Sequence, residues 1–116
     1  FKGAWVMFGG VIIASRNIKD GTVIEILQKP VDGEGRPLET DATEGRFLVQ
    51  ADQFLDSAVY GRGRLITVIG EVSGSRTMPI DEIEYSYPVL APKALHLWRP
   101  STGPRLFFGI GVSGRI

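Results

Sequence analysis

The chain contains no cysteine. Structural disulfides, thiolate metal sites and cysteine nucleophiles are therefore all excluded. Histidine is nearly absent as well: His96 is the single one, and it stands close to Trp98 in an apolar stretch. One histidine without acidic residues at matching spacing makes a poor metal site or catalytic base. We therefore predict a structural, hydrogen-bonded role for His96.

An excess of charge is also missing, because 13 basic residues balance 13 acidic ones. Proteins that bind nucleic acids usually carry a basic surplus, since the release of counterions from phosphates dominates their affinity. The balanced total disfavours nucleic acid as a partner, although it leaves room for a local basic stripe. Long apolar runs are missing too, and none reaches the roughly 18 residues that a membrane-spanning helix needs.

Glycine and proline are abundant instead. The 116 residues include 15 glycines and 7 prolines, which are spread between apolar runs rich in β-branched residues. This spacing is typical of a single β domain with many turns. The pattern predicts strands over residues 4–14, 22–28, 45–51, 60–74 and 84–90, with residues 95–99 extending the last strand.

Three features refine these strands. The first strand is apolar on both faces, which predicts cover on both sides at least in part. Gly9-Gly10 and Gly70 interrupt β-branched runs and predict strand bends of the kind that barrel corners require. Pro88 cannot donate a ladder hydrogen bond, so it predicts an exposed strand edge.

The segments between the strands predict turns of several kinds. They are a hairpin turn over residues 17–21, a long polar loop over 29–45, one helical turn over 53–59 that packs Phe54 and Leu55, and a turn region over 74–81.

This order predicts an all-β fold, a small Greek-key barrel of OB type with five or six strands and one short helical turn. A β-sandwich is the main alternative. We expect residues 1–99 to form the barrel domain and residues 100–116 to form a Gly-rich tail. The apolar run 106–112 of that tail would pair as a sixth strand, dock on the barrel or stay detached.

No combination of residues predicts an enzyme. Asp81, Glu82 and Glu84 form an acidic cluster near a turn, where solvation explains them. Residues 61–64 lack both the lysine of a phosphate-binding loop and the dinucleotide fingerprint. The serines Ser15, Ser57 and Ser73 lack the context of a nucleophile elbow. We therefore predict no catalytic residue, no metal ligand and no cofactor.

Arginines and aromatic residues are the best candidates for an interaction surface. Aromatic side chains beside arginines bind single-stranded nucleic acid in OB folds, whereas strand alternation favours core packing for most of them. The loop over residues 32–44, the barrel rim and the edge near Pro88 are further candidates. The predicted interaction surface consists of Arg36, Arg62, Arg64, Tyr60, Tyr85, Tyr87 and Trp98.

Four segments stand out by their order and spacing, which cover most of residues 1–98. They are FGGVI (8–12), GRP (35–37) with GRF (45–47), FLD (54–56) through Tyr60 into GRLITVIG (63–70), and YSYPV (85–89) with HLW (96–98). Together these segments resemble the Slp family of Gram-negative outer-membrane lipoproteins. Ser57 stands where the resemblance leads us to expect proline, and Asp81 where it leads us to expect glycine. Both departures fall at predicted turns.

The resemblance implies a non-enzymatic, periplasm-facing domain, an envelope structural or interaction module linked to starvation or stress. It also implies a tether to the outer membrane through a lipidated cysteine. Because the sequence begins at Phe1 rather than Met, we expect that cysteine and a signal peptide upstream.

The implied partners are the membrane and an envelope protein or ligand that the resemblance does not identify, and the oligomeric state stays open. The alternative is an OB-fold protein that binds oligonucleotides or a small ligand. Salt-dependent binding to single strands would distinguish a nucleic-acid binder from an envelope module.

Overall fold

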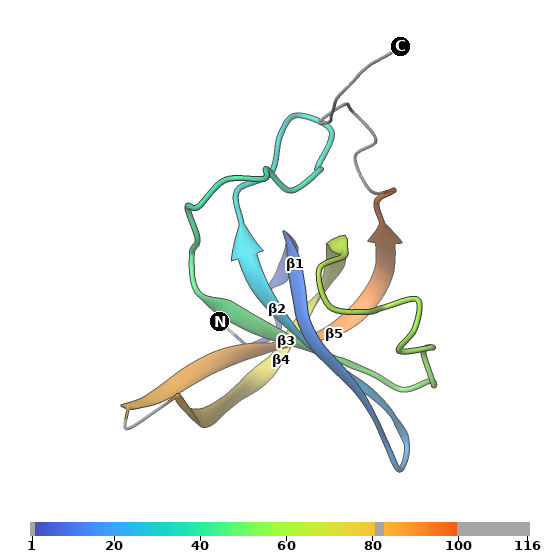
Figure 1. The fold of residues 1–116 in the computed structure, drawn as a ribbon. Helices are drawn as coiled ribbons and strands as arrows, with labels where there is room; N and C mark the ends of the chain where they lie inside the picture. The colour runs from blue at the N-terminus through green and yellow to red at the C-terminus, as the bar shows by residue number, and fades with distance from the viewer. Residues whose placement is uncertain (1, 81–82, 100–116) are drawn as a thin grey trace.

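The computed structural model describes residues 2–80 and 83–99. Their strands close into one barrel in the order β1-β2-β3-β5-β4 (Figure 1). Neighbouring strands are antiparallel except β3 and β5, which are parallel. The predicted small barrel of OB type is confirmed with five strands, and the alternative of two packed sheets is wrong. The strands are β1 (Trp5–Ile18), β2 (Gly21–Lys29), β3 (Arg46–Ala51), β4 (Leu65–Ile80) and β5 (Ile83–Leu97).

Alternate residues of each strand fill the barrel interior. Ile24 and Ile26 of β2 and Phe47 and Val49 of β3 are fully buried, as the predicted alternation requires. Phe8 of β1 packs edge-on against Phe47, with ring centroids 5.3 Å apart. The buried core consists of Ile12, Ile24, Ile26, Phe47, Val49, Ile66, Val68, Val72 and Leu90.

β1 closes the barrel because it pairs on both sides. Residues 5–11 pair with β4, and residues 9–18, with one interruption, pair with β2. At Gly10 the two backbones come very close, since a Cβ there would lie 2.1 Å from the carbonyl oxygen of Leu27. A side chain at this position would therefore push β1 and β2 apart.

Register shifts mark the irregular points of the barrel wall. In the β1–β2 pair a shift falls between Ile12 and Ala14, beyond the predicted bend at Gly9-Gly10. In the β4–β5 pair a shift falls at Gly70, as predicted. A Cβ at Gly70 would lie 2.5 Å from the carbonyl oxygen of Ala91, which explains the glycine there.

β4 and β5 continue beyond the barrel as a two-stranded ribbon, which projects from the body in Figure 1. The turn region predicted over residues 74–81 is therefore wrong, because β4 runs on to Ile80. Glycine and proline signals indicated a loop, but cross-strand pairing outweighs such local preferences. In the described pairs β3 contacts β5 only at Val89 and Leu90, so Pro88 lies outside that ladder, in agreement with the predicted edge.

The connection between β3 and β4 contains no helix among the described residues. The helical turn predicted over residues 53–59 is a single hydrogen-bonded turn, in which Tyr60 N–H donates to the Asp56 carbonyl at 2.8 Å. Phe54 is 68% exposed, so its predicted packing is wrong, whereas Leu55 packs partly against the core. The predicted tail over residues 100–116, with its sixth strand, lies outside the described residues.

Candidate functional site

Two predicted interaction residues, Arg36 and Trp98, meet on the outer face of β4. The guanidinium carbon of Arg36 lies 5.6 Å from the centre of the Trp98 ring, a cation–π distance. The Trp98 indole N–H donates to Oγ1 of Thr67 at 2.8 Å, and that hydroxyl donates to the Gly35 carbonyl at 2.6 Å. His96 packs edge-on against the same indole ring, with centroids 4.3 Å apart, so an aromatic contact replaces its predicted hydrogen bond.

These contacts attach the loop between β2 and β3 to the barrel wall. Within the loop, the Asp32 carboxylate accepts the backbone N–H of Arg36 at 3.0 Å. Gly35 has a φ of +83°, a left-handed conformation that favours glycine. Val31 lies over Gly9, where an added Cβ would come 2.6 Å from Val31 Cγ1. The cation–π contact therefore holds a well-packed loop in place, which is a structural role.

The two arginines of the GRGR motif have different environments. Arg64 donates from Nη1 to the carbonyl of Val59 at 3.2 Å and from Nη2 to the carbonyl of Trp98 at 3.3 Å. Backbone carbonyls thus engage its guanidinium group. Arg62 lies exposed in the turn before β4, whereas Arg64 is only partly exposed.

The three predicted tyrosines lie in different places. Tyr60 packs against the barrel core, and Tyr85 is 45% exposed on the ribbon. Tyr87 is only 3% exposed and packs in a second cluster with Val23 and Leu48. Its assignment to an interaction surface is therefore wrong. The predicted interaction residues do not form one common surface.

An ion pair adjoins this second cluster. Arg46 Nη1 donates to Glu25 Oε2 at 2.7 Å across the β2–β3 pair. This hydrogen bond raises the pKa of Arg46, while burial acts in the opposite direction and Tyr87 adds to the rise. The guanidinium therefore stays charged at any pH at which the fold would be studied.

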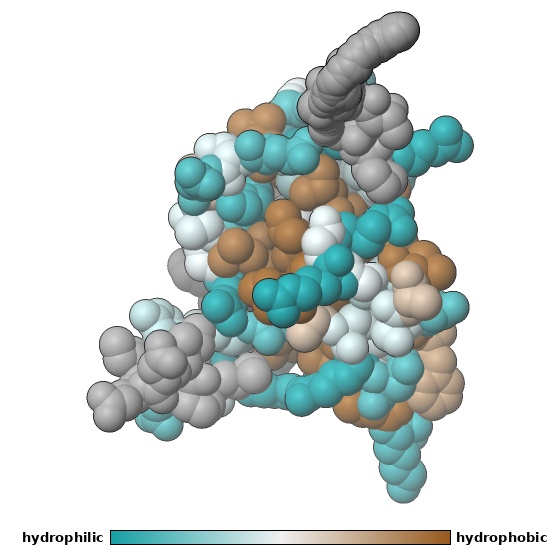
Figure 2. All heavy atoms as spheres, in the orientation of Figure 1, coloured by the Kyte–Doolittle hydropathy of each residue, from teal (hydrophilic) through white to brown (hydrophobic). Residues whose placement is uncertain are grey.

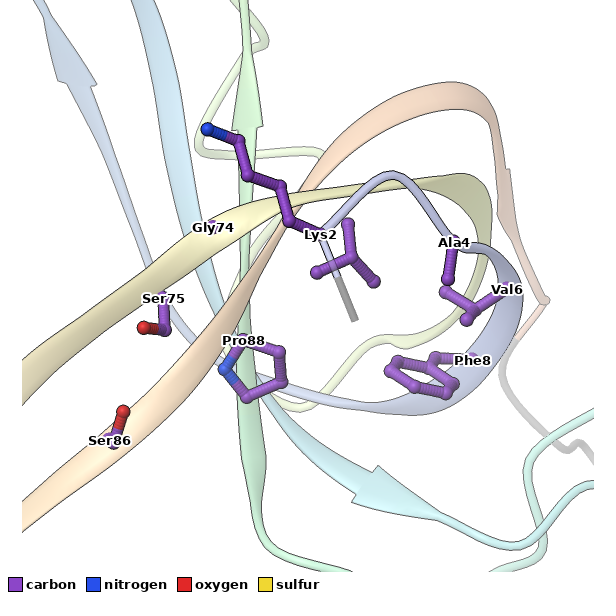
Figure 3. A pocket seen from close by; sticks show the side chains of 9 residues that line it. Lys2, Ala4, Val6, Phe8, Gly74, Ser75, Ser86 and Pro88 are labelled. Atoms are coloured by element: carbon purple, nitrogen blue, oxygen red, sulfur yellow. The ribbon is translucent and has the colours of Figure 1, made fainter.

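A cavity of about 660 Å³ opens at the mouth of the barrel, between the start of β1 and the β4–β5 ribbon. Its wall is mainly apolar, because it is lined by Ala4, which directly precedes β1, by the inward-facing Val6 and Phe8 of β1, and by Val72 of β4. Figure 3 shows Val6 and Phe8 pointing into the hollow from one side, with Pro88 of the ribbon on the other. An elongated apolar group of a ligand in this cavity would contact apolar side chains on both sides.

Polar groups are confined to one part of this cavity. Ser75 and Ser86 contribute hydroxyls from the ribbon, and Lys2 contributes a cation. No acidic or histidine side chain lines the cavity in the described part of the chain, so neither serine has a general base there. Residues 2–80 and 83–99 also contain no group of three or more potential metal-ligating side chains. Among the described residues, the cavity therefore combines an apolar wall with two hydroxyls and one cation.

The sequence carried one signal of this cavity, the apolar character of both faces of the first strand. Alternation sends Ala4, Val6 and Phe8 inward and Trp5 and Met7 outward. The predicted partial cover is present on both sides. The inner residues pack against the core beside the hollow, and the loop between β2 and β3 covers the outer side at Gly9 but leaves Trp5 and Met7 exposed. The sequence predicted the barrel rim and the strand edge near Pro88, which lines the cavity, but not the apolar residues of the opposite wall.

The five strands form a small β-barrel domain with an apolar cavity at its mouth. The sequence profile of the "Outer membrane lipoprotein Slp family" matches residues 1–107. The chain belongs to this family, as the resemblance predicted, and its location is the outer membrane. The described part of the chain has no helix long and apolar enough to span a membrane.

Curated relatives agree with this assignment. The "Uncharacterized lipoprotein YeaY" of Escherichia coli is 30% identical over 98 residues, covering 84% of this chain and 50% of that protein. An uncharacterized protein of Haemophilus influenzae is 31% identical over 98 residues, covering 84% of this chain and 53% of that protein. The "Outer membrane protein Slp" of Escherichia coli is 28% identical over 98 residues, covering 84% of this chain and 52% of that protein. The chain spans about half the length of these relatives.

Two similar solved structures are single-stranded DNA-binding proteins. The small protein from Streptomyces coelicolor has a TM-score of 0.48 and 14% identity, covering 84% of this chain and 95% of that chain. The mitochondrial protein Rim1 from S. cerevisiae has a TM-score of 0.47 and 12% identity, covering 87% of this chain and 100% of that chain. These similarities say nothing about a ligand of this chain.

Proposed function

We propose that this domain is a non-catalytic binding module of an outer-membrane lipoprotein, and that the cavity at the barrel mouth is its ligand site. The proposed ligand is an amphiphile of the envelope, with an acyl-like apolar part and a polar head. The domain faces the periplasm and is tethered through a lipidated cysteine upstream of Phe1.

The cavity is the single observation that carries this proposal. Its volume of about 660 Å³ lies within the range of roughly 300–1,000 Å³ that is common for ligand pockets. Barrel mouths are frequent ligand sites, because strand ends leave the interior open there. The apolar wall at Val6 and Phe8 would cover the hydrocarbon part, while Lys2 would lie near the head.

Binding of single-stranded nucleic acid has less support. The two arginines of the GRGR motif do not act together, since Arg64 is engaged by backbone carbonyls and Arg62 is exposed. The aromatic residues that would stack on bases are dispersed, and Tyr87 is buried. The cavity itself offers hydrocarbon and only one cation to a polyanion.

A fluorescent fatty acid, 11-dansylaminoundecanoic acid, tests the ligand site. Val6→Phe fills the cavity with an apolar ring, and we expect it to weaken binding roughly tenfold because the hydrocarbon loses its place. Met7→Gln is the matched control, since Met7 is the next residue of β1 and faces outward. It should leave the affinity for the probe unchanged.

Two results would contradict the cavity assignment. One is an unchanged affinity in Val6→Phe, provided that its denaturation midpoint stays near that of the parent chain. The other is an equal loss of affinity in Val6→Phe and Met7→Gln, which would place the probe elsewhere on the barrel. A second filling variant, Ala4→Leu, keeps the test valid if Val6→Phe does not fold.

The proposed tether has a separate test. The natural gene should encode a signal peptide ending in a cysteine, and mass spectrometry of the mature protein should find that cysteine lipidated. An upstream region without such a cysteine would exclude this anchor. It would leave the ligand-binding result at the cavity unaffected.

A further inference from the structure

We propose that the outer face of β1 and β4 carries a membrane-docking patch, made of Trp5, Met7 and Ile69, that lies against the lipid surface. These large apolar side chains are 61%, 50% and 43% exposed, respectively. The patch and the cavity use opposite faces of β1, so the two proposals are independent.

The three side chains of the patch are neighbours. Met7 and Ile69 are direct partners in the β1–β4 pair, and Trp5 lies two residues before Met7 on the same face. Partners of this kind have Cβ atoms about 5 Å apart, so their side chains touch or nearly touch. Ala94, the partner of Ile69 on β5, is exposed and small, and it extends the surface without rising above it. The result is a continuous apolar surface across three strands.

Hydrophobic side chains also reach the surface at several places on the face drawn in Figure 2. Four other large apolar residues of the described chain are well exposed, but none of them lies on β1 or β4. Met7 and Ile69 differ from them in being paired on adjacent strands of the barrel wall. The four are Leu38, Phe54, Val59 and Tyr85.

The docking patch has definite borders. The loop between β2 and β3 covers the same face at Gly9 and comes near Met7 at Gly35, where a Cβ would lie 3.7 Å from Met7 Sδ. Glu71, the partner of Trp5, and Lys93, next to Ala94, add one charge of each sign at the edge. Because these charges balance, the apolar side chains must supply most of the affinity for a surface.

The size of the patch favours a lipid surface over a protein. Its side chains expose on the order of 300 Å² together, whereas a stable protein interface buries about 800 Å² on each partner. Lipid sets no comparable minimum, and the indole of Trp5 suits the boundary between hydrocarbon and headgroups. Membership of an outer-membrane lipoprotein family puts such a surface beside the domain. Weak docking is sufficient for a tethered protein, since the local lipid concentration is high.

Vesicles of phosphatidylethanolamine and phosphatidylglycerol in a 3:1 mixture test the patch. Trp98→Phe leaves Trp5 as the single tryptophan of the chain. We expect Trp5 emission to shift to the blue on addition of vesicles, and lipids brominated in their acyl chains to quench it. Co-sedimentation at millimolar lipid measures the partition coefficient between water and vesicles. The double variant Met7→Gln/Ile69→Gln should lower this coefficient roughly tenfold.

The control is Phe54→Gln, which removes an equally exposed apolar side chain outside the patch. It should bind vesicles like the parent chain, and raising the salt concentration should change little. Three outcomes would overturn the proposal: no binding by the parent chain at millimolar lipid, equal binding by the double variant, or a dimer that the double variant dissociates. The last outcome would assign the face to a second copy of the chain.

Discussion

Trp98 donates its indole N–H to the hydroxyl of Thr67, with Nε1 and Oγ1 2.8 Å apart, and the same hydroxyl donates to the loop carbonyl of Gly35 at 2.6 Å. One side chain thus joins the end of β5 to the loop between β2 and β3. Thr67 is 7% exposed, so water does not easily replace these bonds.

Removal of this hydroxyl should destabilise the barrel. Thr67→Val leaves the Trp98 N–H and the Gly35 carbonyl without their partner, and we expect a loss of about 1–3 kcal/mol in the free energy of unfolding. Urea denaturation followed by tryptophan fluorescence measures it. Thr67→Ser keeps the hydroxyl and should recover most of the loss. Equal stability of the valine and serine variants would show that the bonds contribute nothing net.

Because β1 and β2 come so close at Gly10, replacing a glycine by alanine should destabilise the barrel there and not at an open position. Gly10→Ala would place a Cβ 2.1 Å from the Leu27 carbonyl oxygen, against backbone that cannot swing aside. We expect a loss of about 3 kcal/mol or failure to fold. Gly74→Ala is the control within a strand, because nothing lies within 4 Å of its Cβ position. It should be neutral or stabilising by up to about 1 kcal/mol, since alanine restricts the unfolded chain. Similar denaturation midpoints for the two variants would contradict this account.

The Arg46–Glu25 pair should contribute modestly to the free energy of unfolding, and this contribution should not change with pH between about pH 7 and 10. The side chains are 33% and 19% exposed, so a double-mutant cycle with Arg46→Met and Glu25→Gln should give a coupling of about 0.5–1 kcal/mol that falls with added salt. The hydrogen bond to Glu25 raises the pKa of Arg46. The stabilisation is therefore fully present below the unfolded-state pKa and is lost only as pH rises through the still higher folded-state pKa. Coupling that disappears between about pH 7 and 10 would be inconsistent with this assignment.

We expect Lys2 to attract the charged head of a bound amphiphile and to have no effect on binding of its hydrocarbon part. Lys2→Gln should weaken binding of 11-dansylaminoundecanoic acid roughly threefold, because an exposed cation gives only a small attraction. The corresponding uncharged dansylated amide serves as control and should bind the parent and the variant equally. An equal effect on both probes would mean that Lys2 acts through the shape of the cavity.

A labelled single-stranded oligonucleotide should show no saturable binding to this chain at low salt. The physical reason is the balanced charge together with the engagement of Arg64 by backbone carbonyls. Fluorescence anisotropy measures it. Tight binding that fades with added salt and weakens in Arg62→Ala would instead establish the nucleic-acid alternative.

Much of the barrel was predictable because the strands alternate clearly. Ile24 and Ile26, and likewise Phe47 and Val49, stand two positions apart and so share one face of their strand, and all four are fully buried. The β4–β5 ribbon was not predictable, because Gly74 and the prolines near it are local turn signals. Only the pairing of the two strands with each other shows that they continue.

The candidate site was much less predictable. Arg36 and Trp98 were predicted as interaction residues, and in the structure their contact holds a loop against the barrel. The burial of Tyr87 could not be predicted from the sequence. Strand alternation tells on which face of the strand a residue lies, but not whether another segment covers that face. In the structure Val23 and Leu48 cover it, and they belong to strands distant in sequence.

The sequence by itself determined the strand content, the family and the absence of thiol chemistry, because these depend on residue type and short-range spacing. Tertiary structure alone decided which apolar residues remain uncovered. Ala4, Val6 and Phe8 read as core residues, but closure of the barrel around β1 leaves a hollow beside them. Trp5 is 61% and Met7 50% exposed, since the loop between β2 and β3 packs over their side of β1 at Gly9 and only borders Met7 at Gly35. Burial depends on what a distant part of the chain brings to a face, and local periodicity carries no information about that.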